Sequence, residues 1–166
     1  MARSARRMER MLQELMDFTR TRLAGGLALR PEPAVLDAVV ARVVEERRRE
    51  HPGRTLHLEA EGDLRGHWDT HRLAQLADNL LSSVLHQGAE DSPVTLRAVG
   101  AVGGVTLCVR SPGLTVAAEE RSSLFEPFRR ERGATPEGLG LGLYIAGRSP
   151  WPTAGSWRWS PAPGAA

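Results

Sequence analysis

The glycines that alternate between positions 138 and 142 are the strongest chemical signal in the sequence. Gly138, Gly140 and Gly142 are separated by leucines, and Leu143 continues into an apolar segment that is expected to be helical. Glycine lets the backbone approach a ligand closely, and free amides at a helix N-terminus favour phosphate oxygens. Two interpretations are open, a phosphate-binding turn and a glycine-rich turn without a ligand. The pattern fits neither a P-loop nor the dinucleotide fingerprint, because no Lys-Ser/Thr follows it and no strand leads directly into it.

Two further motifs precede these glycines. Residues 124–130 read Leu-Phe-Glu-Pro-Phe-Arg-Arg, and residues 79–88 read Asn-Leu-Leu-Ser-Ser-Val-Leu-His-Gln-Gly at the end of an expected helix. In this order the motifs resemble the N box, F box and second glycine box of the ATP-binding domain of bacterial sensor histidine kinases, a Bergerat-type ATPase. Residues 7–20 are similar to the second helix of that family's dimerisation domain, so the resemblance covers residues 5–146.

The resemblance implies that the N-box helix binds the phosphates and Mg²⁺ of ATP. Asn79 lies on the face that presents side chains to them. Ser83, one turn later on the same face, stands where the family carries an Asn that ligates Mg²⁺, and its hydroxyl is a shorter and poorer ligand. His86 stands at a position that is often basic in the family. It is either a phosphate contact or an exposed histidine at a helix end.

The first glycine box departs from the family pattern. Where the family usually has Asp or Asn, then any residue, then Gly, this chain has Ser111 and Gly113. The family's acid accepts a hydrogen bond from the adenine amino group. A serine accepts one without the assistance of a charge, which weakens the bond by on the order of 1 kcal/mol. We therefore expect weak binding of Mg-ATP.

The F box and the glycines complete the expected ATP site. Phe125 and Phe128 are interpreted as packing residues that brace the lid, and Arg129 is either a γ-phosphate contact or a surface arginine. Asn79 and Ser83 are also the expected, weak Mg²⁺ ligands. The complete ATP-binding set is Asn79, Ser83, His86, Ser111, Gly113, Phe125, Phe128, Arg129, Gly138, Gly140, Gly142 and Leu143.

The resemblance implies a protein-histidine kinase of two-component signalling, with ATP and Mg²⁺ as cofactors. The family's acceptor histidine lies in a His-Glu-Leu-Arg-Thr-Pro-like motif, and none of the five histidines has that context. We therefore expect transfer of the γ-phosphoryl group to a histidine outside this chain, a homodimer through the N-terminal helix, and a response regulator as partner. The expected location is the cytoplasm, with an intact parent that could be membrane-anchored. The alternative is a degenerate, inactive remnant that dimerises or binds nucleotide weakly.

Hydrophobic spacing predicts the elements that position these motifs. Residues 4–24 form an amphipathic helix that ends at Gly25-Gly26, and its apolar stripe packs either on a partner helix or in its own core. Residues 35–50 form a second helix, and Asp69 or Thr70 caps a third.

Strands are expected at 55–59, 64–68, 94–99 and 104–110, the first two and the last two as hairpins, with a short helix near 117–125. This order predicts an α+β fold with two layers. The resemblance implies a two-layer α/β sandwich of the histidine kinase ATPase type, preceded by one amphipathic helix and lacking its final strand.

Composition excludes several classes. The chain is 41% hydrophobic and 25% charged, which is typical of a soluble globular protein. A net charge of +2 argues against nucleic acid as a partner. The single Cys108 excludes an internal disulfide and is expected to be buried in a strand. No apolar run is long enough to span a membrane.

The predicted domains are residues 1–26, part of a dimerisation and phosphoacceptor domain, residues 27–146, the ATP-binding domain, and residues 147–166, an irregular tail. With codons rich in G and C, residues 147–159 read one base earlier give Arg-Glu-Ile-Ala-Leu-Ala-His-Gly-Gly-Glu-Leu-Ala-Val, which resembles the family's usual ending. We hypothesise that the tail is out of frame, through a mutation or a sequencing error, which the nucleotide sequence tests.

Overall fold

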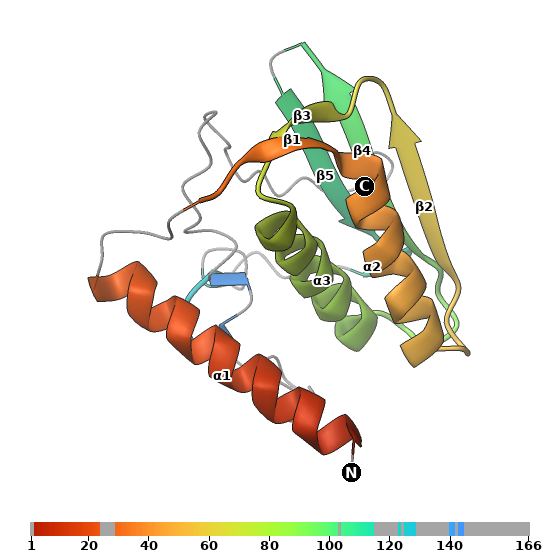
Figure 1. The fold of residues 1–166 in the computed structure, drawn as a ribbon. Helices are drawn as coiled ribbons and strands as arrows, with labels where there is room; N and C mark the ends of the chain where they lie inside the picture. The colour runs from red at the N-terminus through yellow and green to blue at the C-terminus, as the bar shows by residue number, and fades with distance from the viewer. Residues whose placement is uncertain are drawn as a thin grey trace. The chain divides into compact units, whose positions relative to one another are not determined.

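The structure of the chain is a computed structural model that describes residues 2–23, 29–102, 104–114, 123, 125–128, 140–141 and 143–144 (Figure 1). Two compact units are present. Of the described residues, 29–102 and 104–114 belong to one unit, and 2–23, 123, 125–128, 140–141 and 143–144 belong to the other. The expected short helix near 117–125 lies almost wholly outside the described residues, and the tail 147–166 lies entirely outside them.

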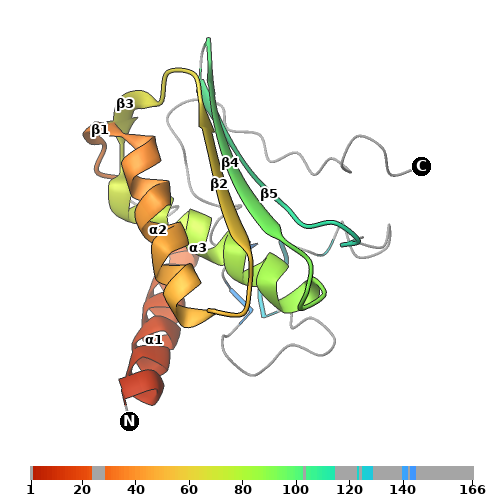
Figure 2. The ribbon, with the colours of Figure 1, turned by 90° about the vertical axis from the view of Figure 1, so that its right-hand side faces the viewer.

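The first unit is a two-layer α/β sandwich, as predicted. Helices α2 (Leu36–Glu50) and α3 (Thr70–Gln87) cover one face of a three-stranded sheet (Figure 2). The sheet has the order β2-β4-β5, formed by β2 (Leu56–Glu61), β4 (Val94–Ala101) and β5 (Gly104–Arg110). Its core consists of fully buried side chains from both layers, among them Leu36, Val40, Val44, Leu81, Val94 and Leu96.

Hydrogen bonds determine where α2 and α3 begin. Asp69 caps α3, as predicted, and its side chain accepts a bond of 3.0 Å from the Arg72 N–H. Helix α2 has no side-chain cap, and its first amide, that of Leu36, donates instead to the Leu64 carbonyl at 3.0 Å. A free amide at a helix N-terminus needs such a partner when it is buried, so the segment before β3 completes the start of α2.

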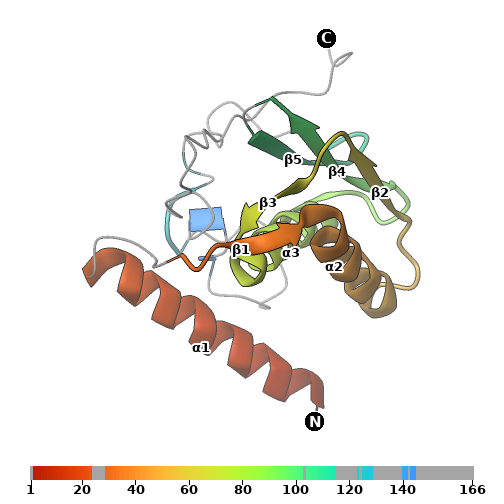
Figure 3. The same ribbon diagram turned by 45° about the horizontal axis from the view of Figure 1, so that its top comes forward.

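The predicted hairpin between residues 55–59 and 64–68 is wrong. Strand β2 pairs in parallel with β4, from Leu56 with Val94 to Glu61 with Val99. Strand β3 (Arg65–Trp68) pairs antiparallel with β1 (Glu32–Val35), a strand that the sequence did not predict. Figure 3 shows β1 leading directly into α2. Proline is tolerated in β1 because both strands of this small sheet are edges.

The backbone at Gly62 explains why the hairpin does not form. Gly62 has a φ of 75°, which turns the chain away from β2. The next residue, Asp63, crosses the end of β4 so closely that a Cβ on Gly100 would lie 2.1 Å from the Asp63 carbonyl oxygen. The chain thereby leaves the three-stranded sheet, and the hydrogen-bonding edge of β2 is taken by β4.

The antiparallel hairpin of β4 and β5 is confirmed, with Ala101 opposite Gly104 at its turn. Cys108 lies in a strand, β5, as predicted, but the prediction that it is buried is wrong, because it is only half-buried there. None of the helices in the described ranges is long and apolar enough to cross a membrane.

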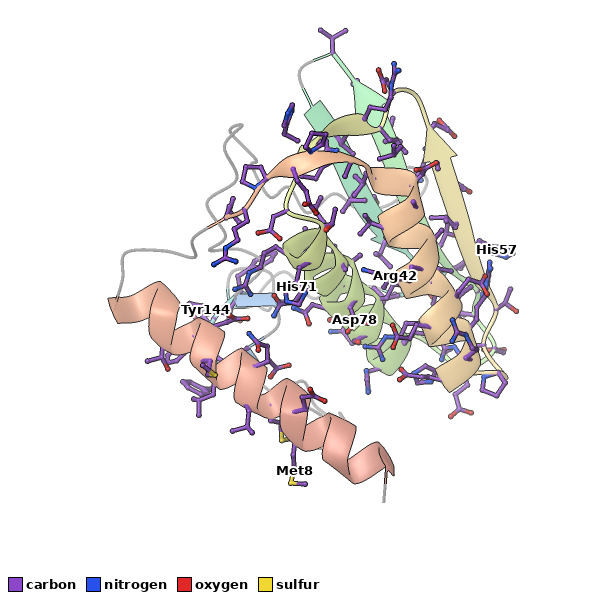
Figure 4. The ribbon with its side chains drawn as sticks, in the orientation of Figure 1. Met8, Arg42, His57, His71, Asp78 and Tyr144 are labelled. Carbon is purple, nitrogen blue, oxygen red and sulfur yellow. The ribbon has the colours of Figure 1, made fainter. Side chains whose placement is uncertain are left out.

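The second unit contains α1 (Ala2–Leu23) and a small aromatic cluster. Phe18 packs on Leu141 and Tyr144, and its ring lies 5.5 Å from that of Tyr144. Other parts of the predicted apolar stripe of α1 stay exposed, and Met8 projects freely from the helix (Figure 4). The exposed apolar side chains on α1 are Met8, Leu12, Leu15 and Met16.

Candidate functional site

Helix α3 carries three of the predicted site residues. Asn79 and Ser83 are half-buried and four residues apart, so they share one face of the helix. His86 is exposed in the last turn, where its Nδ1 donates a hydrogen bond of 2.6 Å to the Ser82 carbonyl oxygen. This bond fixes the ring against its own helix and directs Nε2 away from it.

A buried ion pair holds α3 against α2 directly beside Asn79. The Arg47 guanidinium, only 6% exposed, donates through Nε and Nη2 to both oxygens of Asp78 at 2.6 and 2.7 Å. Burial alone would lower the pKa of Arg47, but the hydrogen bonds and the charge of Asp78, aided by Glu50, outweigh it and raise that pKa. A two-pronged contact of this kind fixes orientation as well as distance, so it sets the rotation of the helix that bears Asn79.

Ser111 lies at the C-terminal end of α3, although it follows β5 in the sequence. A Cβ built on Gly88, the residue that ends α3, would lie 3.2 Å from Ser111 Oγ. The sheet register explains this proximity, because Thr95 at the start of β4 pairs with Arg110 at the end of β5. Gly113 has a φ of 76° and open space around its Cα. Glycine is therefore required at position 113 by the backbone conformation and not by a close neighbour.

The described F-box and glycine-box residues belong to the other compact unit. Phe128 has a φ of 61° and places its ring edge-on to Phe18 of α1, with 4.9 Å between the ring centres. Phe125 and Leu143 are half-buried, and Gly140 has a φ of 69°. Phe128 is 53% exposed despite its contact with Phe18. The predicted roles of Phe125 and Phe128 in bracing the lid, and the contacts of these residues with nucleotide, stay predictions. Arg129, Gly138 and Gly142 lie outside the described residues.

The residues that could hold Mg²⁺ are few. Among the described residues no group of three or more His, Cys, Asp or Glu side chains could hold a metal ion. The Asp78 carboxylate is bound on both oxygens by Arg47, which leaves the Asn79 amide oxygen and the Ser83 hydroxyl on this face. Such a pair fits an ion that is held mainly by substrate phosphates, the usual situation for Mg²⁺ in proteins.

Three residues near the site escaped the sequence reasoning. Arg47 and Asp78 pair across 31 positions, and nothing in either local pattern distinguishes them from solvated charges. Arg54, in the turn between α2 and β2, donates to the Gly88 carbonyl oxygen at 3.4 Å and so lies beside Ser111. No sequence motif includes Arg54, so it gave no signal of its own.

Comparisons with known proteins identify the family and the fold. Residues 68–159 match the family described as histidine kinase-, DNA gyrase B-, and HSP90-like ATPases. Bacteriophytochrome of Pseudomonas aeruginosa is 32% identical over 146 residues, 86% of this chain and 20% of the relative. Sensor histidine kinase GlrK of Escherichia coli is 30% identical over 149 residues, 86% of this chain and 30% of the relative. The chain thus spans less than a third of the length of either relative.

Solved structures show the same fold. Full-length ShkA in complex with AMPPNP superposes with a TM-score of 0.68 at 26% identity, over 83% of this chain and 29% of that one. Histidine kinase ThkA in complex with response regulator protein TrrA gives a TM-score of 0.63 at 21% identity, over 86% of this chain and 40% of that one.

The chain therefore belongs to the family of histidine kinase-, DNA gyrase B- and HSP90-like ATPases. Within that family it is the ATP-binding module of a sensor histidine kinase. The family match extends into the tail after residue 146, whose reading frame stays a prediction.

Proposed function

We propose that this chain binds Mg-ATP along α3 and presents the γ-phosphoryl group to a histidine on another segment. The placement of Ser111 at the C-terminal end of α3 carries the proposal, because it joins the first glycine box to the helix that bears Asn79 and Ser83. These residues lie far apart in the sequence. Their convergence in a chain of this family favours a nucleotide site over an unliganded helix face.

In this proposal the chain acts by positioning. Phosphoryl transfer depends mostly on placing the reactants and stabilising charge, with little covalent participation by the protein. Asn79 and Ser83 supply oxygens to the Mg²⁺, which neutralises charge on the phosphates when bound. The Arg47–Asp78 pair holds the rotation of α3 and with it the direction of those oxygens. The roles of the F box and the second glycine box follow from the family resemblance.

The exposed apolar face of α1 supports a homodimer. Met8, Leu12 and Leu15 recur at spacings of four and three residues and are 60%, 62% and 45% exposed. Side chains at these spacings line one stripe of a helix, which is how two helices pack in a coiled coil or bundle. We therefore propose that two copies associate through α1.

A response regulator is the proposed recipient of the phosphoryl group in the complete system. The neighbouring structure of ThkA contains the response regulator protein TrrA. We also propose the cytoplasm as the location of this module.

Calorimetric titration of the full chain with Mg-ATP tests the nucleotide site. We expect weak, magnesium-dependent binding that Asn79→Ala removes and Ser83→Asn strengthens, because an amide oxygen reaches further than a hydroxyl. His57→Gln, an exposed change on β2, is the matched control and leaves binding unchanged. Equal affinity of all four proteins, or no heat with any of them, would contradict the proposal.

A further inference from the structure

Strand β1 follows α1 in the order of the elements, and it is held to its own unit mainly by hydrogen bonds. It pairs with β3 in a two-stranded sheet whose register runs from Glu32 to Val35. A sheet of two strands is only marginally stable without a buried face. The side chains of Glu32, Pro33 and Val35 are exposed, and that of Ala34 is half-buried. Burial of apolar surface therefore contributes little to holding β1 in place.

The Asp69 carboxylate joins the residues before β1 to the start of α3. Its Oδ1 caps the helix by accepting from the Arg72 N–H at 3.0 Å, and its Oδ2 accepts from the Arg30 N–H at 2.9 Å. Thr70, the next residue, donates a longer bond of 3.3 Å to the Glu32 carboxylate. Hydrogen bonds to charged acceptors are stronger than those between neutral groups. Both bonds have a charged acceptor, and the shorter one, to Asp69, is the main attachment of this segment.

The attachment changes in kind at Leu36, where β1 leads directly into α2 (Figure 3). Leu36 is 1% exposed, and its amide donates to the Leu64 carbonyl oxygen at 3.0 Å. Val39 and Val40, one turn further along α2, are also buried. Detaching β1 exposes little apolar surface, whereas detaching α2 opens the core of the sandwich. A local opening that begins at Arg30 therefore ends before Leu36.

We propose that β1 is a detachable strap, that Asp69 is its latch, and that release of the strap lengthens the connection between α1 and the unit that contains α3. Residues 30–35 span roughly 20 Å when they are extended, while α2, α3 and the three-stranded sheet stay folded. The proposal rests on the nucleotide site proposed above, because the γ-phosphoryl group there must reach a histidine on another segment. The docked and the released strap give this transfer a short and a long reach.

Two variants break the latch in different ways and leave the cap of α3 in place. Asp69→Asn keeps one oxygen for the Arg72 amide, and Asn caps helices about as well as Asp does, but its amide group turns donors towards the Arg30 N–H. Arg30→Pro removes that N–H and leaves Asp69 unchanged. Arg30→Ala is the matched control, because it removes an exposed side chain and keeps the backbone donor.

Hydrogen exchange of the full chain, followed residue by residue by NMR, measures the release. We expect the protected amides of β1 and β3 to exchange about tenfold faster in both latch variants, since each loses about one hydrogen bond to a charged acceptor. The amides of Val40 in α2 and Leu96 in β4 should keep their wild-type rates. Arg30→Ala should leave the rates in β1 and β3 unchanged. If the Arg72 amide also exchanges faster in Asp69→Asn, the cap is lost there and Arg30→Pro decides.

Two results in the exchange data would overturn the strap. One is a wild-type rate for β1 and β3 in both latch variants. The other is an equal acceleration at Val40, because the opening would then continue into α2.

Titration with Mg-ATP separates the strap from the nucleotide site. We expect both latch variants to bind with wild-type affinity, because Asn79 and Ser83 are unchanged. A loss of affinity would show that the substitutions disturb α3 itself, which contradicts the assignment to the strap. Failure of the wild type to bind Mg-ATP would overturn the nucleotide site and the role of the strap in transfer, whereas the exchange rates still decide whether β1 detaches.

Discussion

Replacing Asp78 with alanine would leave the Arg47 guanidinium buried without its main partner. The side chain of Arg47 is 6% exposed and makes two short bonds to Asp78, at 2.6 and 2.7 Å. Removing one partner of a buried ion pair typically costs about 3–5 kcal/mol. Asp78 is 33% exposed and Glu50 still contacts Arg47 at 3.0 Å, so water and Glu50 replace part of what is lost. We therefore expect Asp78→Ala to lower the free energy of unfolding by about 2–3 kcal/mol.

Urea unfolding followed by circular dichroism measures this loss. The midpoint should fall while the slope stays constant, because the surface exposed on unfolding does not change. In a thermal scan the same loss corresponds to a decrease in Tm of roughly 5–10 °C for a chain of this size. Arg42→Met, on the exposed side of α2, is the control and should change stability by less than about 0.5 kcal/mol.

A double variant separates the charge from the contact. Arg47→Met with Asp78→Leu replaces the ion pair by apolar side chains, and such replacements are often neutral or stabilising. We expect its stability to lie within about 1 kcal/mol of the wild type. Two results would refute the reasoning that burial makes this pair sensitive to losing one partner. One is a loss in the free energy of unfolding below about 0.5 kcal/mol for Asp78→Ala. The other is a double variant that is less stable than Asp78→Ala alone.

Three further predictions concern the same unit. Leu96→Ala, at a fully buried position in β4, should lower the free energy of unfolding by about 2–5 kcal/mol in urea, and a loss below about 1 kcal/mol would mean that the site is not closely packed. Asp69→Ala removes the cap that accepts from the Arg72 N–H and should cost about 1 kcal/mol, whereas Asp69→Asn should retain most of the stability. The side-chain and backbone hydrogen bonds from Arg65 lower the pKa of Asp63 to about 2, so the stability that this contact provides is complete above pH 4 and is lost as the pH falls towards 2. A carboxyl titration by NMR should show that pKa return towards 3.8 in Arg65→Gln, and a pKa near 3.8 in the wild type would exclude the contact.

Local patterns predicted most of the elements correctly. The apolar spacing of α2 and α3, the Asp69 cap and the hairpin of β4 and β5 depend on residues close together in the chain, and all four are confirmed. The partner of β2 was predicted wrongly because the short link through Gly62 looks like a hairpin turn. The chain instead leaves the three-stranded sheet after Gly62, where the backbone of Asp63 lies close against Gly100. That close approach is a tertiary contact with no counterpart in local sequence.

Some residues of the candidate site could be predicted from the sequence and others could not. Asn79 and Ser83 were singled out by the resemblance of residues 79–88 to the family's N box, and the structure shows that both lie on α3 at a spacing that shares a face. Arg54 and Gly88 could not be predicted, because they meet Ser111 only after the sheet register has brought the three segments to one end. Arg54 is also one of many arginines in a chain without lysine, so its residue type carried no information.

The parallel pairing of β2 with β4 also constrains the order in which the protein folds. Leu56 pairs with Val94, and β3 and all of α3 lie between them in the chain. Closing such a long loop is slow compared with forming a local hairpin. During synthesis the edge of β2 that pairs with β4 therefore stays open until β4 has emerged, and the exposed charges of β2, Glu59 and Glu61, oppose pairing with other chains in that interval.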